Sequence, residues 1–153
     1  IPEPPCGDYI DALIHPRIYH AAWKAFELGQ HGQAIVLAVK EIEDAISLLV
    51  SGNINATGVE LVRQAFDQEN GPLASLESTA QENLGISDLL AGFFERYKGL
   101  PANAPFSVAQ TARVLSLASY LMSTLEAIHP RQAEGAEEQA PPEQPYEFEF
   151  LKE

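Results

Sequence analysis

The sequence predicts an all-α, bundle-like domain of five helices, followed by a Pro/Glu-rich linker and an extended aromatic C-terminal tail. Three observations predict this fold class. Apolar residues recur at spacings of three and four along five segments between residues 15 and 129. Glycine, proline and asparagine separate these segments, and none of them alternates as a strand would. The 153 residues are enough for one domain with a core and too few for two.

The first two helices are expected to form one of two long antiparallel pairs. The first begins at Pro16, where the missing amide hydrogen is tolerated, and stops at Gly29. The second covers "QAIVLAVKEIEDAISLLV", residues 33–50, and ends before Gly52. The residues expected to face the core are Ile18, Ala22, Ala25, Phe26, Ile35, Val39, Ile42, Ile46 and Leu49.

Capping boxes are predicted to start the other three helices. A short helix begins at "TGVE", residues 57–60, and a long one begins at Thr79 with Glu82, or at Ser78 with Gln81. The last begins at "SVAQ", residues 107–110. The residues expected to be buried are Leu61, Ala65, Phe66, Leu84, Leu89, Leu90, Phe93, Phe94, Val114, Leu117, Leu121, Leu125 and Ile128.

Composition divides the chain into three parts. We expect an extended N-terminal arm over residues 1–12, a helical domain over 13–130, and an acidic linker with a C-terminal tail over 131–153. The linker is rich in Glu, Gln, Ala and Pro, a composition typical of solvated segments.

The tail "PYEFEFLKE" has a different pattern. Tyr146, Phe148 and Phe150 alternate with Glu147 and Glu149, so an extended conformation would have one aromatic face and one acidic face. Peptides of this kind dock in a groove of their own domain or pair with a partner chain. We therefore treat the three aromatic residues as an interaction tail.

The charge balance argues against a nucleic-acid partner. The net charge is −13 and only nine Lys and Arg are present, whereas phosphate binding depends on clusters of these residues. Cys6 is the single cysteine, which fits a reducing, cytoplasmic compartment. No apolar run approaches the roughly 18 residues of a membrane span. No membrane association is expected.

The histidines and carboxylates give no strong metal motif. None of the pairs among His15, His20, His31 and His129 has the helical spacing of a metal site, so no metal and no cofactor are expected. Glu41 and Asp44 lie one turn apart in "KEIEDAIS", as in helical pyrophosphohydrolases that bind Mg²⁺ through paired acidic motifs.

The second of these paired acidic motifs is missing. A magnesium-dependent nucleotide hydrolase using Glu41, Asp44 and Glu82 stays open as an alternative. The simpler interpretation is the polar face of an amphipathic helix.

Four stretches resemble a known family in the right order: "IHPRIYHAAWKAFELGQHGQAIVLAVKEIEDAI", "TGVELVRQAF", "GPLA" and "ENLGISDLLAGFF". They resemble the Ymh-type family of small bacterial helical proteins over roughly residues 13–128. This family is usually grouped with the HEPN superfamily, so the resemblance implies a HEPN-like fold that often dimerises. Many HEPN domains cut RNA without a metal, using an Arg and a His about four to six residues apart at the start of the last core helix.

In this sequence the corresponding stretch is "FFERYKGLPANAPFS", residues 93–107. Asn103 and Pro105 resemble the Asn-Pro core of the motif, but Ala102 replaces the arginine, and Ser107 or Val108 replaces the histidine. The resemblance thus implies a degenerate motif without RNase chemistry. Alternatively, prolines in this loop simply end one helix and prepare the next. The loop residues of interest are Ala102, Asn103, Pro105, Phe106 and Ser107.

We therefore expect a non-catalytic HEPN-like protein that acts through protein–protein interaction, as a homodimer with a further, unknown protein partner. The resemblance implies a bacterial setting such as phage defence or a toxin–antitoxin-like system. The expected contact residues are the interaction tail and the loop around Asn103 and Phe106. An RNase with displaced catalytic groups is a second alternative. Mimicry of nucleic acid ranks last, because seven of the 22 acidic residues lie at or beyond Glu134.

Overall fold

The computed structural model describes residues 13–131, and its helices confirm the predicted all-α, bundle-like fold. The five helices are α2 (Pro16–Glu27), α3 (His31–Leu49), α4 (Gly58–Ala65), α5 (Ala80–Tyr97) and α6 (Val108–Glu126). No strand occurs in this range, and no helix within it is long and apolar enough to cross a membrane. The N-terminal arm with Cys6, and the interaction tail with Tyr146, Phe148 and Phe150, lie outside the described residues.

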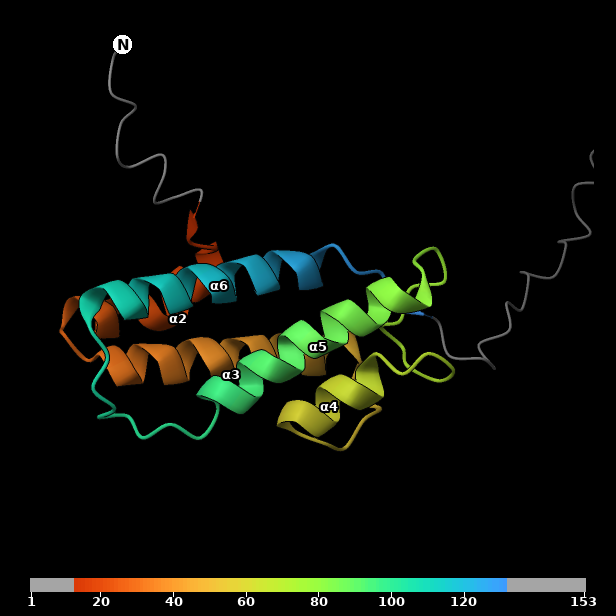
Figure 1. Cartoon of the computed structure of the whole chain (residues 1–153), viewed down its shortest axis with the longest axis horizontal. Coiled ribbons are helices and arrows are strands. Elements are labelled where there is room, and N and C mark those ends of the chain that lie inside the picture. The colour runs from red at the N-terminus through yellow and green to blue at the C-terminus, as the bar shows by residue number, and fades with distance from the viewer. Residues whose placement is uncertain (1–12, 132–153) are drawn as a thin grey trace, which may run out of the picture.

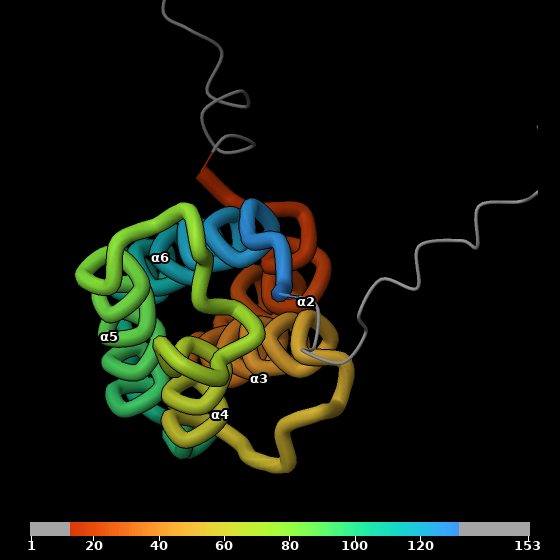
Figure 2. The backbone as a smooth tube through the Cα atoms, turned by 90° about the vertical axis from the view of Figure 1, so that its right-hand side faces the viewer, coloured from red at the N-terminus to blue at the C-terminus, as the bar shows by residue number. Residues whose placement is uncertain are grey.

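Helix α3 lies at the centre of the bundle (Figures 1 and 2). It contacts each of the other four helices, and α2 and α6 pack most extensively on it. Helices α2 and α3 form the expected antiparallel pair. Helix α5 packs mainly on α4, whereas α6 packs mainly on α3, so the last two long helices are not a tightly packed pair.

The composition of α3 explains its central place. Its buried positions combine isoleucines with alanines over a wide arc of the helix surface. Ile35, Ile42 and Ile46 are fully buried, and each contributes about 1.5–3 kcal/mol of hydrophobic stabilisation. The alanines leave room for neighbouring helices to approach. The buried residues of α3 are Gly32, Ala34, Ile35, Ala38, Val39, Ile42, Ala45 and Ile46.

Two of the predicted capping boxes are confirmed. At the start of α5, the Glu82 amide donates to Thr79 Oγ1 (3.2 Å) and the Thr79 amide donates to Glu82 Oε2 (2.9 Å). At the start of α6, Ser107 and Gln110 exchange the same pair of hydrogen bonds at 3.1 and 3.0 Å. These reciprocal bonds satisfy amide groups that a helix N-terminus leaves without partners.

The predicted box at residues 57–60 is wrong. Thr57 precedes α4, but its side chain makes no capping hydrogen bond. Instead, the amide of Gly58 donates to Glu43 Oε2 on α3, at a distance of 2.9 Å. A carboxylate from a neighbouring helix therefore replaces the local cap, and the same oxygen also pairs with Lys98. Glu60 bonds to the Gln64 amide group within α4.

The predicted buried face of α5 is partly wrong. Leu84 and Leu89 are 48% and 53% exposed, and Leu117 on α6 is 39% exposed. The helix turns the polar residues Asn83 and Ser87 inward instead, because both find hydrogen-bond partners there. Asn83 exchanges two bonds with the backbone of Ser75, at 3.1 and 2.9 Å, and Ser87 Oγ accepts from an Arg63 guanidinium on α4, at 3.0 Å.

A core substitution tests this packing. Replacing Leu115, which is fully buried on α6, with Ala should lower the free energy of unfolding by about 2–5 kcal/mol, because a cavity remains beside α3. The matched control is Leu48→Ala on α3, where the side chain is 71% exposed and the change should stay within about 0.5 kcal/mol. Chemical denaturation followed by circular dichroism measures both, and equal losses would contradict the described core.

Candidate functional site

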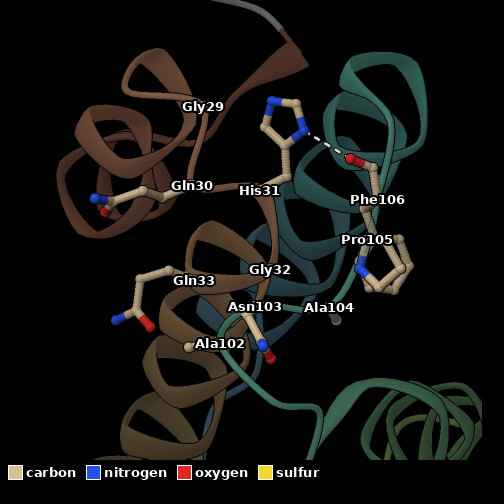
Figure 3. A pocket seen from close by; sticks show the side chains of 10 residues that line it. All are labelled: Gly29, Gln30, His31, Gly32, Gln33, Ala102, Asn103, Ala104, Pro105 and Phe106. Carbon is tan, nitrogen blue, oxygen red and sulfur yellow. Dashed lines mark hydrogen bonds between the residues drawn. The ribbon is translucent and has the colours of Figure 1, made fainter.

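Two hollows flank the connection between α5 and α6. The first, here called the loop pocket, is an open hollow of about 630 Å³ between residues 29–33 and residues 102–106 (Figure 3). The second, here called the interhelix groove, is an open hollow of about 280 Å³ between the end of α5 and the first half of α6. Phe106 lines both hollows. The groove is lined by Arg96, Tyr97, Phe106, Gln110, Arg113, Val114 and Leu117.

Gly32 allows the loop to lie against the first turn of α3. A Cβ atom at this position would lie 2.6 Å from the carbonyl oxygen of Ala102 and 2.9 Å from the amide nitrogen of Ala104. These are backbone atoms, which cannot turn away as a flexible side chain could. The close approach of two backbones therefore requires glycine here.

His31 fastens the loop to the same turn of α3. Its Nδ1 lies 2.7 Å from the carbonyl oxygen of Phe106, as the dashed line in Figure 3 shows. A carbonyl oxygen only accepts hydrogen bonds, so Nδ1 is the donor; in the neutral ring Nε2 is then the acceptor nitrogen. The half-buried ring also packs against Phe26, with 5.7 Å between ring centroids. This role of His31 was missed by the sequence analysis, because its partner is 75 residues away.

The loop itself is a turn held by backbone bonds. The Ala104 amide donates to the Pro101 carbonyl, and the Phe106 amide donates to the Ala104 carbonyl. The nitrogen–oxygen distance is 3.0 Å in both bonds. Of the predicted loop residues, Ala102, Asn103, Pro105 and Phe106 come together around the loop pocket. Ser107 does not join them, since it caps α6.

The loop pocket offers little charge. Glycine, glutamine, alanine, asparagine, proline and phenylalanine make up its lining, and His31 is the one lining residue with a titratable side chain. The nearby Arg96 lies on the groove side, with its guanidinium carbon 5.9 Å from the Phe106 ring centroid and 5.0 Å from that of Tyr97. The pocket can therefore accept polar or apolar groups, but its own lining holds no fixed charge.

The carboxylates considered for magnesium do not come together. Glu41 is paired with Arg17 at 2.8 Å, Glu82 is held in the capping box of α5, and Asp44 is exposed on α3. Across residues 13–131, no group of three or more His, Cys, Asp and Glu side chains is placed to hold a metal ion. His15 is engaged separately, with its Nε2 2.8 Å from Glu126.

The chain is thus an all-α bundle whose α5–α6 loop is fixed on the first turn of its central helix. A family model described as "Protein of unknown function (Hypoth_ymh)" matches residues 12–125, which is most of the chain. The chain belongs to this family, and the resemblance seen in the sequence is confirmed at that level. No curated protein and no solved structure matches it.

The close approach at Gly32 gives a direct test of the loop. Gly32→Ala should lower the free energy of unfolding by about 1–3 kcal/mol, because the added methyl group pushes the backbone of Ala102 and Ala104 away. Gly85→Ala is the matched control, since no atom lies within 4 Å of a Cβ there. It should stabilise the exposed face of α5 by about 0.5–1 kcal/mol. Thermal or urea unfolding measures both, and a neutral Gly32→Ala would contradict the close approach.

Proposed function

We propose that this protein is non-catalytic and acts through protein–protein interaction, with a homodimer as its working form. The observation that carries this proposal is the loop pocket: its backbone is fixed in place, yet its lining is almost entirely uncharged. A HEPN-like relationship is part of the proposal, and with it a bacterial setting such as phage defence or a toxin–antitoxin-like system. Ala102, Asn103 and Pro105 then represent a degenerate nuclease motif that keeps its loop.

Metal-free RNA cleavage makes two chemical demands on a site. A base must take the proton of the attacking 2′-hydroxyl, and a cation must stabilise the charge that develops on the phosphate. The lining of the loop pocket supplies one imidazole, whose Nδ1 is already engaged, and no Lys or Arg. The proposal of a non-catalytic protein rests on this shortage.

Exposed apolar side chains support the interaction role. Leu89 on α5 is 53% exposed and Tyr120 on α6 is 62% exposed, on the two helices that border the interhelix groove. Apolar and aromatic residues of this kind form the buried centres of protein interfaces. The partner of a homodimer would cover these side chains.

An RNA-cleavage assay tests the non-catalytic proposal. We expect no cleavage of total RNA or tRNA, with EDTA or with Mg²⁺, because the loop lacks the required pair of side chains. The products are separated on a gel, with a catalytic HEPN nuclease as positive control. Cleavage that requires Mg²⁺, or hydrolysis of nucleotides, would favour the carboxylate alternative with Glu41, Asp44 and Glu82.

One observation favours a second candidate, an RNase with displaced groups. His31 contacts the backbone of Phe106, while the guanidinium of Arg96 lies near the ring of the same residue. His31 Nε2 would act as the base, and Arg96 would stabilise the phosphate. Cleavage in EDTA that is lost in both His31→Ala and Arg96→Ala would support this candidate and contradict the first.

The homodimer is tested by mass. At micromolar concentration, sedimentation velocity should give twice the 16.7 kDa of one chain. Leu89→Glu with Tyr120→Glu should shift the protein to a monomer, because two charges cannot be buried without partners at an apolar interface. Leu48→Glu, at a leucine that is 71% exposed on α3, is the control and should leave the mass unchanged. A monomer before any substitution would exclude the homodimer.

A further inference from the structure

We propose that the interhelix groove is the docking site for residues 146–150 of the same chain. The aromatic side chains of the interaction tail would occupy the apolar floor of the groove. Glu147 and Glu149 would lie at its rims, beside Arg96 and Arg113. This inference goes beyond the proposed function: it does not need the homodimer, and it takes up the expectation from the sequence that the interaction tail is a binding element.

The size and lining of the groove suit side chains rather than a separate small molecule. Its volume of about 280 Å³ is below the roughly 300–1,000 Å³ of ligand pockets. Its apolar lining comes from three segments: Tyr97 at the end of α5, Phe106 in the loop, and Val114 with Leu117 on α6. Tyr97 and Phe106 are only half-buried, so both present ring surface to an incoming aromatic group.

Charge at the rims indicates an acidic occupant. Arg96 and Arg113 are exposed, both line the groove, and neither forms an ion pair with any carboxylate in residues 13–131. Arg17, Arg63 and Lys98 pair with carboxylates in this range, whereas Lys24 and Lys40 do not. The two arginines differ from these lysines because both line the groove. In a chain with a net charge of −13, two arginines left without carboxylates beside one apolar hollow favour an acidic, aromatic ligand.

The sequence of the tail has the chemistry that this groove requires. In an extended peptide, successive side chains point to opposite sides, so Tyr146, Phe148 and Phe150 share one side. Glu147 and Glu149 lie on the other side, where the long arginine side chains at the rims can reach them. Aromatic groups on one side and carboxylates on the other match an apolar floor with cationic rims.

The connection is long enough for docking within one chain. Arg131 is bonded to the carbonyls of Pro72 and Ala74, between α4 and α5, which is the opposite end of α5 from the groove. The 19 residues of α6 span about 28 Å, whereas the residues between 131 and 146 can extend to about 46 Å. A connection of this length gives a tethered peptide a local concentration near the millimolar range, which favours the same chain over a second copy.

Photocrosslinking in the full chain tests the docking site. With p-benzoylphenylalanine in place of Phe148, irradiation and peptide mass spectrometry should find crosslinks to residues 93–117. Arg96→Glu with Arg113→Glu should lower the crosslink yield about tenfold, because two attractive charge pairs become repulsive. Lys24→Glu with Lys40→Glu is the matched control, since both lysines are exposed outside the groove and the charge change is the same. Circular dichroism checks that both double variants keep the helical fold.

Mixing light and heavy isotope-labelled chains separates the outcomes. Crosslinks that join two light peptides or two heavy peptides support docking within the chain. Crosslinks that join a light peptide to a heavy one would show that a second copy supplies the tail, and would overturn the proposal. Crosslinks scattered outside residues 93–117, or a yield that Arg96→Glu with Arg113→Glu leaves unchanged, would overturn it as well. The mass measurement remains separate: a monomer with crosslinks in the groove would exclude the homodimer and leave this docking site intact.

Discussion

Packing against α3 is the interaction on which the rest of the structure depends. The other four helices all contact this helix, and its isoleucine and alanine positions fill the centre of the bundle. Its first turn also carries Gly32 and His31, which hold the α5–α6 loop in place. One helix therefore organises both the hydrophobic core and the loop pocket, and it adds fixed contacts to the local hydrogen bonds of the loop.

The helices could be predicted from the sequence wherever their signals are local. The capping boxes at Thr79 and Ser107 and the end of the first helix before Gly29 depend on residues within a few positions of one another. The predictions were wrong where a distant residue decides. Glu43 on α3 replaces the expected cap at Thr57, and the hydrogen bonds of buried Asn83 turn Leu84 toward solvent. The periodicity of apolar residues predicts a buried face, but it does not reveal which polar residues find hydrogen-bond partners in the interior of the bundle.

The candidate site was predicted in part. The breaks at Pro101 and Pro105 located the loop, but the sequence did not show what the loop packs against. The contacts of Gly32 and His31 join segments about 70 residues apart, and a single sequence contains no signal for that pairing. A glycine in the first turn of a long apolar helix was the one available hint, since helix propensity disfavours it. That Arg96 and Arg113 line one groove likewise became visible only in the structure, because they lie on different helices.

The bond between His31 and Phe106 has a consequence for how the protein folds. It spans 75 residues, so the loop pocket cannot form until α3 and α6 have docked. Bringing such distant segments together costs loop-closure entropy, which the packing of the helices offsets. The position of the loop against α3 therefore depends on the packing of the whole bundle, whereas the turn itself has local hydrogen bonds. The amides of Ala104 and Phe106 bond to carbonyls of the loop itself, so exchange of their hydrogens with solvent would report on the opening of this turn, whether or not the bundle opens with it.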